Sequence, residues 1–333
     1  MATQNIPVIS IARLDGGETL AALDQACREW GFLQVVDHGI DDAVIDALYR
    51  EMRAFFVQPM PAKRAISRTA DNPWGFYDRE LTKNTRDWKQ IYDYGPPDGA
   101  ALRPQWPAGM PAFRPAVEAF YGACEKLALQ LLSAVAVNLG MPRDALHADF
   151  VPAHTSFLRL NYYPRCPNPE RTAGLATPKS GHLGINHHTD AGALTLLLQD
   201  EQPGLEVYRY GEWHLIEPRR DALVINIGDV VQVWSNDRYR ASLHRVIASA
   251  GAERFSAPFF LNPSYAACYS PLPTTVDERH PPAYRSINWG EFRALRAAGD
   301  YADCGEEVQI THYRIESEEQ RHGLHSHRVA ARG

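Results

Sequence analysis

The stretch His188-Thr189-Asp190-Ala191-Gly192-Ala193-Leu194-Thr195-Leu196-Leu197 is the most informative part of this chain. His188 and Asp190 are two residues apart, and in an extended chain the side chains at i and i+2 point to the same side. An imidazole and a carboxylate on one side, joined by one more ligand, form a facial triad that leaves positions open on a non-haem Fe(II) ion. We expect His244 to be the third ligand.

A second pair with the same spacing, Arg254 and Ser256, begins ten residues after His244. A guanidinium carries a planar fork of N–H donors that matches the two oxygens of a carboxylate. A hydroxyl on the same side of the strand can add one more hydrogen bond. The pair is therefore a candidate carboxylate-binding site.

Further motifs surround these residues in a fixed order. They are Asn161-Tyr162-Tyr163-Pro164, Asn226-Ile227-Gly228-Asp229, Trp234-Ser235-Asn236, Ser242-Leu243-His244-Arg245-Val246 and Arg254-Phe255-Ser256-Ala257-Pro258-Phe259-Phe260. The order resembles that of the iron- and 2-oxoglutarate-dependent oxygenases of the isopenicillin N synthase superfamily. The resemblance extends from Ile6 to about Pro263, which is most of the chain.

The resemblance implies an enzyme that uses Fe(II), 2-oxoglutarate and O2 to oxidise a small organic molecule. The outcome would be hydroxylation, desaturation or ring closure, with release of succinate and CO2. The iron ligands would be His188, Asp190 and His244.

The resemblance also places 2-oxoglutarate. Its distal carboxylate would pair with Arg254 and accept a hydrogen bond from Ser256. Tyr163 would be a further donor, and Asn161 and Arg159 would be close neighbours. The combination of Asn161 with Tyr163 favours 2-oxoglutarate over an enzyme that works without it.

Three alternatives stay open at this point. Isopenicillin N synthase and aminocyclopropane-carboxylate oxidase use iron and O2 without 2-oxoglutarate, and they carry the same Arg-x-Ser pair. Ethylene-forming enzymes of the same broad class break down 2-oxoglutarate itself. A catalytically silent ligand-binding module is the alternative from another functional class, and the complete triad argues against it.

Candidate substrate contacts are aromatic. Trp74-Gly75-Phe76-Tyr77 resembles a region that often faces substrate in this family, and Asp87 to Gly95 resembles a neighbouring strand. The candidates are Phe76, Tyr92 and Phe260. They indicate an apolar or aromatic small molecule as the substrate.

The composition narrows the class of protein. With 333 residues, 45% hydrophobic and 22% charged, the chain can bury a sizeable core as a globular protein. A net charge of −6 argues against a nucleic-acid partner. No membrane span and no secretion signal are expected, and five scattered cysteines suit the reducing cytoplasm. The sequence leaves the oligomeric state open.

The expected fold is mainly β with flanking helices, built on a double-stranded β-helix, or jelly roll. Short runs bounded by turn signals predict strands at 156–163, 194–198, 205–208, 222–227, 230–234, 243–247 and 255–260, and earlier strands are expected at Ile6–Ile11 and Phe32–Val36. Helical spacing predicts helices at Thr19–Trp30, from Asp41 to about Phe56, at Phe113–Asn138 and at Trp289–Ala297.

We expect three regions along the chain. Residues 1–150 would form a mixed α/β region that packs on the core, residues 151–270 the jelly roll, and residues 271–333 a C-terminal extension. Residues 171–186 look like an inserted loop beside the metal and suggest a lid. The extra histidines His182 and His187 are expected not to bind iron.

Overall fold

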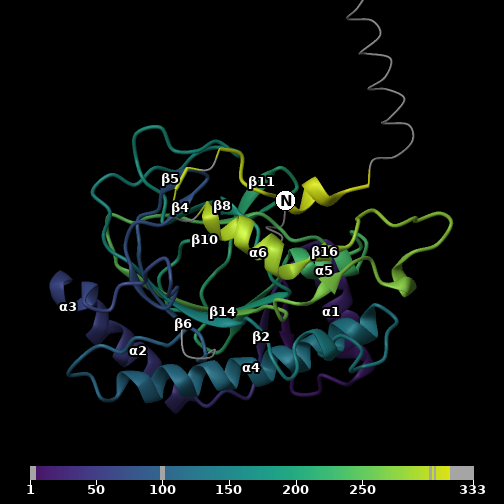
Figure 1. Ribbon diagram of the computed structural model, residues 1–333, viewed down its shortest axis with the longest axis horizontal. Helices are drawn as coiled ribbons and strands as arrows, with labels where there is room; N and C mark the ends of the chain where they lie inside the picture. Colours follow the sequence, from purple (N-terminus) through teal and green to yellow (C-terminus); the bar gives the residue numbers. More distant parts are fainter. Residues whose placement is uncertain (1–4, 98–101, 300–301, 304, 316–333) are drawn as a thin grey trace, which may run out of the picture.

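The computed structural model describes residues 5–97, 102–299, 302–303 and 305–315. Two sheets face each other, and helices cover the outer side of the larger one (Figure 1). The larger sheet has the strand order β1-β2-β12-β9-β14-β7-β6-β3, and the smaller has the order β11-β10-β13-β8. This is the jelly-roll architecture expected from the sequence. The histidine-rich residues 316–333 lie outside the described ranges.

The elements have the following bounds. The strands are β1 Val8–Ser10, β2 Phe32–Val36, β3 Gly75–Tyr77, β4 Leu81–Thr82, β5 Thr85–Arg86, β6 Gln90–Tyr94, β7 Phe157–Tyr163, β8 Ile185–His188, β9 Leu194–Gln199, β10 Leu205–Arg209, β11 Glu212–Leu215, β12 Leu223–Ile227, β13 His244–Val246, β14 Arg254–Leu261, β15 Cys268–Tyr269 and β16 Ile287–Asn288. The helices are α1 Gly17–Glu29, α2 Asp42–Phe56, α3 Met60–Arg64, α4 Phe113–Asn138, α5 Asp229–Trp234 and α6 Trp289–Ala298, with short 3-10 turns at His147–Asp149, Pro273–Thr275 and Ile310–Tyr313.

Most of these elements follow from the sequence pattern. The predicted strands β2, β7, β9, β10, β12, β13 and β14 form within one residue of their expected ends, and α4 has the expected bounds. Asp41 caps α2 as expected, because its carboxylate accepts a hydrogen bond of 2.8 Å from the amide of Ala43.

The expected strand at 230–234 is wrong, because these residues form the helix α5. The run Val230-Val231-Gln232-Val233-Trp234 is buried on all sides, so it lacks the alternation that distinguishes a strand from a buried helix. Two strands of the smaller sheet, β8 and β11, were not expected, and β8 includes the last two residues of the supposed loop 171–186.

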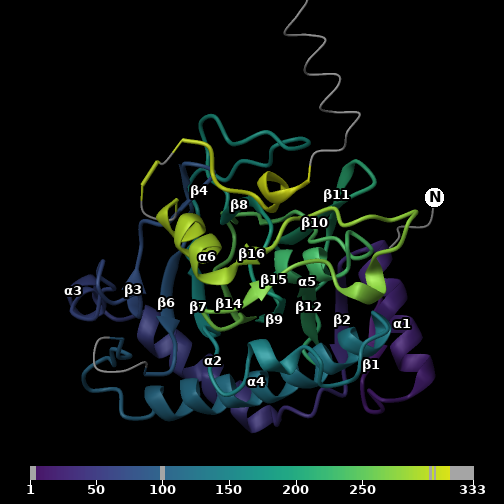
Figure 2. The same cartoon turned by 45° about the vertical axis from the view of Figure 1, so that its right-hand side comes forward.

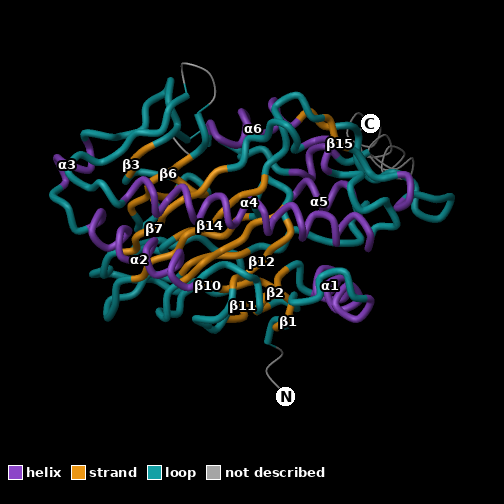
Figure 3. The backbone as a smooth tube through the Cα atoms, turned by 90° about the horizontal axis from the view of Figure 1, so that it is seen from below, coloured by secondary structure: helices purple, strands orange, loops and turns teal. Residues whose placement is uncertain are grey.

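Helix α4 lies under the larger sheet and fills its outer face with apolar side chains. Figures 1 and 2 show it along the bottom of the molecule, beside α2, and Figure 3 shows it crossing the strands. Within the described ranges, α4 is the one helix long and apolar enough to span a membrane, although no stretch of that length was expected from the sequence. Its apolar window is 61% buried in the protein, as in the core helix of a globular domain.

The N-terminal region contributes strands to both ends of the larger sheet. β2 pairs with β12 on one side, and β6 pairs with β7 on the other. The two pairings widen the jelly-roll sheet, so the inner face that carries the site continues onto the N-terminal strands. The division of the chain at residues 150 and 270 stays a prediction.

Candidate metal centre and active site

A cavity of about 180 Å³ lies between the two sheets. The alternation of β7 directs Arg159, Asn161 and Tyr163 into it, while Leu158 and Leu160 pack toward the helices. The other polar or charged side chains that line it are Glu80, Thr82, Lys89, His188, Thr189, Asp190, Thr195, Asn226, His244, Arg254, Ser256, Asn262, Arg293, Arg296 and Glu307. Most of the residues predicted to do chemistry therefore share one space.

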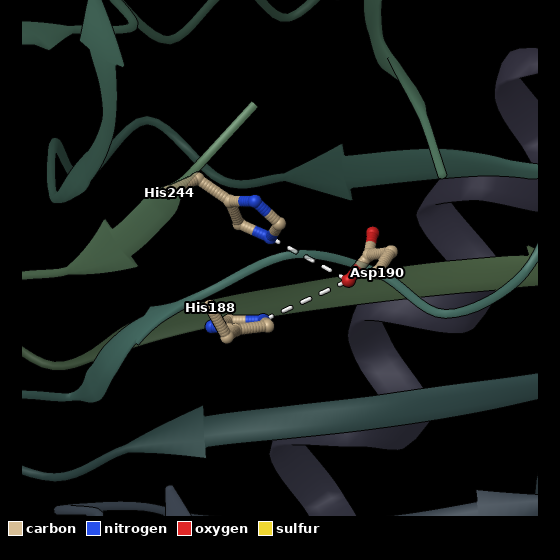
Figure 4. A group of neighbouring side chains, drawn as sticks. All are labelled: His188, Asp190 and His244. Atoms are coloured by element: carbon tan, nitrogen blue, oxygen red, sulfur yellow. Dashed lines mark ion pairs between the residues drawn. The ribbon is translucent and has the colours of Figure 1, made fainter. Parts of the chain in front are cut away.

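His188, Asp190 and His244 all line this cavity, and their side chains point toward one another (Figure 4). His188 and His244 are paired residues of the neighbouring strands β8 and β13. Oδ1 of Asp190 lies 3.7 Å from Nε2 of His188 and 3.5 Å from Nε2 of His244. Within the described part of the chain, these three form the one cluster of His, Cys, Asp or Glu side chains with ligand atoms close enough to share a metal ion.

Each imidazole is held in the tautomer that a metal needs. Nδ1 of His188 lies 2.9 Å from the carbonyl oxygen of Asn186, and Nδ1 of His244 lies 3.1 Å from that of Ser242. A carbonyl oxygen only accepts hydrogen bonds, so each Nδ1 carries a proton and Nε2 is the ring nitrogen left to bind a metal ion. Burial and the neighbouring His244 lower the pKa of His188 to about 3, which keeps it neutral, whereas the carboxylate of Asp190 outweighs burial and raises the pKa of His244.

The carboxylate of Asp190 is oriented in the same way. Its Oδ2 accepts hydrogen bonds from Thr195 Oγ1 and, at 2.8 Å, from Asn226 Nδ2. Oδ1 is left to face the two imidazoles. Burial alone would raise the pKa of Asp190, but His244, His188 and Thr195 outweigh it and hold that pKa well below its ordinary value.

Close packing fixes the turn that carries Asp190. A Cβ added to Gly192 would lie 2.1 Å from Oδ1 of Asn262, and one added to Gly228 would lie 2.1 Å from the carbonyl oxygen of Gly192. No other residue fits at either position without moving the backbone. The amide of Asp229 also donates to the carbonyl oxygen of Asp190, at 2.8 Å.

Two imidazole nitrogens and one carboxylate oxygen, all directed to one point, are the donor set of a non-haem Fe(II) site. The hydrogen bonds behind these donors explain why they hold their orientation without further support. The residues therefore fit the metal that the sequence predicts.

Asn226→Ala is expected to lower the affinity for Fe(II) about tenfold, because losing a residue that hydrogen-bonds to a metal ligand typically costs about 10- to 100-fold in metal affinity. The change removes the amide that orients Asp190 but leaves the three ligands in place. Anaerobic Fe(II) titration would measure it. Asn138→Ala is a suitable control, because the Asn138 amide also donates a hydrogen bond, of 2.9 Å to the carbonyl oxygen of Leu20, but Asn138 does not line the cavity. Equal iron affinity in all three proteins would contradict this role.

Arg254 lines the same cavity on the facing sheet and is only 4% exposed. One of its amino groups donates to Gln199 Oε1 at 2.9 Å, while its Nε and other amino group have no hydrogen-bond partner among the described residues. A buried guanidinium with unpaired donors is costly unless an anion completes it. The site is therefore built for a carboxylate, as 2-oxoglutarate would provide.

The other residues expected around 2-oxoglutarate gather beside Arg254. Strand pairing sets Tyr163 opposite Arg254 and Asn161 opposite Ser256. Arg254 lies over the ring of Tyr163, 5.1 Å from its centre, and Asn161 donates to Ser256 Oγ at 3.3 Å. Oδ1 of Asn161 has no partner among the described residues, so a polar ligand can still be accommodated here.

Arg159 also lines the cavity, but its guanidinium is already engaged. It donates to both carboxylate oxygens of Asp93, at 2.8 and 2.9 Å, and to Glu80 at 2.8 Å. This differs from Arg254, whose Nε and one amino group have no partner among the described residues. Any contact of Arg159 with 2-oxoglutarate stays a prediction.

Two of the three expected substrate contacts are wrong. Phe76 and Tyr92 are fully buried, do not line the cavity and pack against Phe55 on the helix side of the sheet. Phe260 does line the cavity, where its ring stacks on Phe157 at 4.7 Å.

The expected lid role of residues 171–186 is not supported by the cavity lining, which includes only Ile185 from this segment. The loop is attached to the outer face of the smaller sheet, where Arg171 pairs with Glu206 and Arg245 donates to the carbonyl oxygen of Thr172 at 2.9 Å. Leu205 and His244, the neighbours of Glu206 and Arg245, face the cavity instead. The β4–β5 region, α6 and Glu307 cover the cavity in its place.

The extra histidines lie apart from the triad. The ring of His182 packs on Trp88 at 4.7 Å, and that of His187 lies 6.5 Å from Trp213. Neither belongs to the cluster of possible metal ligands.

Sequence reasoning missed the residues that orient the ligands. The alternation of Thr195, Leu197 and Gln199 in β9 was a usable signal, because it brings all three to the inner face of the sheet. Asn226 stood in a recognised motif without an assigned role. No motif pointed to Arg293 or Arg296 of α6.

Comparison with protein families agrees with this geometry. The family described as the 2OG-Fe(II) oxygenase superfamily matches residues 154–263. The family described as the N-terminal region of non-haem dioxygenases in morphine synthesis matches residues 6–112.

Similar proteins cover nearly the whole chain. Jasmonate-induced oxygenase 2 of Arabidopsis thaliana is 32% identical over 92% of this chain and 83% of its own, and flavanone 3-dioxygenase 2 of Oryza sativa is 33% identical over 86% and 82%. The structure of JOX2 in complex with 2OG, Fe and JA superposes with a TM-score of 0.81 at 29% identity, over 94% of this chain and 90% of that one. A full-length Neurospora crassa protein in complex with alpha-KG and thymine gives 0.77 at 25% identity, over 89% and 97%. This chain belongs to the 2OG-Fe(II) oxygenase superfamily and is an Fe(II)- and 2-oxoglutarate-dependent dioxygenase.

Proposed function

We propose that His188, Asp190 and His244 hold the iron of this dioxygenase and that Arg254 and Ser256 bind the distal carboxylate of 2-oxoglutarate. The observation that carries the proposal is the buried guanidinium of Arg254, whose free N–H donors line the same cavity as the triad. A dicarboxylate that lies between the cluster of His188, Asp190 and His244 and the guanidinium of Arg254 would provide a ligand for each of them.

The bound iron supplies the oxidative chemistry, in which 2-oxoglutarate and O2 are consumed and succinate and CO2 are released. The protein's own part is to bind and orient. Asn226 and Thr195 fix the carboxylate of Asp190, and the Asn186 and Ser242 carbonyls fix the imidazoles. The aromatic pair Phe157 and Phe260 gives the remaining space an apolar wall that keeps water from the reacting C–H bond.

The primary substrate is a small organic molecule that enters this remaining space. Similar enzymes are named for flavanone and feruloyl-CoA, and JOX2 and the Neurospora crassa protein have been solved with JA and thymine, respectively. They support an apolar or aromatic body for the substrate, as does Phe260. Hydroxylation, desaturation and ring closure are all compatible with such a site.

The wild-type enzyme tests the proposal directly. With Fe(II) and O2, succinate is expected to form only when 2-oxoglutarate is added, and a screen of small metabolites is expected to find compounds that accelerate it. Mass spectrometry would measure succinate and oxidised product together. Product formed at full rate without 2-oxoglutarate would instead mean that Arg254 and Ser256 bind the primary substrate, as in an oxidase of the isopenicillin N synthase type.

A further inference from the structure

Helix α6 presents one face to the active-site cavity. Trp289, Arg293 and Arg296 all line the cavity, and their spacing of four and three residues places them on the same side of a helix. In Figure 1, α6 lies above the larger sheet, on the side opposite α4. The C-terminal extension therefore brings two guanidinium groups to a site whose iron and 2-oxoglutarate residues come from the jelly roll.

Most other charges in the cavity wall are already balanced. Glu80, Lys89 and Arg159 belong to a buried network that also contains Arg68, Asp87 and Asp93. Three cations meet three carboxylates in it, so the network as a whole is neutral. The charges of its members balance one another, so the network offers no net charge to a ligand.

Glu307 and Arg296 are also engaged. Glu307 accepts a hydrogen bond of 2.7 Å from the amide of Lys83, whose ammonium lies 3.4 Å from the same carboxylate. Arg296 donates to the carbonyl oxygens of Thr189, at 2.8 Å, and of Val308, at 3.1 Å. It therefore supports the backbone between the iron ligands His188 and Asp190 instead of facing a ligand.

Arg293 is different. Its side chain is half-buried, and among the described residues no carboxylate lies within ion-pair distance of it. Its guanidinium lies over the ring of Phe157, 5.8 Å from the centre. Phe157 in turn stacks on Phe260, so Arg293 stands at the edge of an apolar aromatic surface inside the cavity.

We propose that Arg293 binds a carboxylate of the primary substrate, and that the substrate's apolar body lies on Phe157 and Phe260. A guanidinium fork fits a carboxylate in two parallel hydrogen bonds. The site would then hold two different acids, with 2-oxoglutarate on Arg254 and the substrate on Arg293. The inference rests on the proposed function, because Arg254 must be taken by 2-oxoglutarate for Arg293 to act on the second acid.

Anaerobic calorimetry on the full chain tests this. The protein is loaded with Fe(II) and saturated with 2-oxoglutarate, so that Arg254 is occupied. Phenylacetic acid, 3-phenylpropanoic acid and cyclohexaneacetic acid are then titrated, each against its own amide. In the wild type at least one acid is expected to bind roughly tenfold more tightly than its amide, the low end for a charge-assisted hydrogen bond at a half-buried site.

The variants locate the effect. Arg293→Gln is expected to remove the preference for the acid, and Arg293→Lys to keep part of it, because lysine retains the charge without the fork. Arg285→Gln is the matched control, since Arg285 lies in the same extension over the ring of Tyr313 but outside the cavity lining. It is expected to keep the wild-type preference.

Other outcomes would overturn the proposal. These are an absence of binding by every acid, equal binding of acid and amide, or an acid preference that survives Arg293→Gln or disappears in Arg285→Gln. A titration of 2-oxoglutarate into the Fe(II)-loaded protein, carried out first, distinguishes failure of the proposed function from failure of the present inference. If 2-oxoglutarate itself does not bind, the proposed function fails; if it binds and acids gain nothing from Arg293, only the present inference fails.

Discussion

Alanine in place of His188, Asp190 or His244 is expected to abolish Fe(II)-dependent turnover. Each side chain supplies one of three donors at a single point, and among the described residues these three form the one such cluster. The fold should survive, because the three residues line a cavity between the sheets and are not part of the apolar core. Iron stoichiometry after anaerobic desalting would measure metal binding, O2 uptake would measure turnover, and thermal unfolding would measure the stability of the fold.

His182→Ala and His187→Ala are the matched controls, since both histidines precede His188 by a few residues. Both variants should bind iron in the wild-type ratio. Full turnover in any triad variant would remove that residue from the metal centre. Loss of stoichiometric iron in either control would mean that the ligand set is wrong.

Arg254→Lys is expected to raise the 2-oxoglutarate concentration needed for half-maximal activity by roughly one to two orders of magnitude. Lysine keeps the charge but not the planar fork, and a charge-assisted hydrogen bond is worth about 1.5–3 kcal/mol, with each 1.4 kcal/mol a factor of ten. Succinate formation at varied 2-oxoglutarate would measure the change.

Ser256→Ala and Tyr163→Phe are expected to have smaller effects than Arg254→Lys, because each removes a neutral donor. Iron binding should persist in all three variants, since the triad lies apart from these side chains. An unchanged 2-oxoglutarate requirement in Arg254→Lys would show that the co-substrate binds elsewhere in the cavity.

The sequence predicted the metal ligands because their chemistry is local. His188 and Asp190 lie in one short motif, and His244 lies in a second motif, Ser242-Leu243-His244-Arg245-Val246, that follows it in the order typical of the family. The positions of most strands around them could also be predicted, because each is a short run bounded by turn signals. Only tertiary packing could show that Val230–Trp234 belongs to a helix, since these residues are buried on every side and their pattern does not distinguish a helix from a strand.

The substrate side of the cavity was harder to predict, because it too depends on tertiary packing. Phe76 and Tyr92 lie on the paired strands β3 and β6, where both side chains are part of the core on the helix side and no residue of either strand lines the cavity. Arg293 comes from an extension with no motif. Its position depends on how α6 docks over the cavity, which no local pattern reveals.

The N-terminal strands at both ends of the larger sheet constrain how this enzyme is made. β2 leaves the ribosome early, but its partner β12 is synthesised much later, after α4 and most of the jelly roll. Until then β2 has an exposed edge, and such edges are prone to intermolecular pairing. Assembly therefore depends on contacts between distant parts of the chain, which slow folding. The two segments matched by separate families would not be expected to fold when expressed apart, so shortening the gene to its catalytic half would yield aggregate instead of a minimal enzyme.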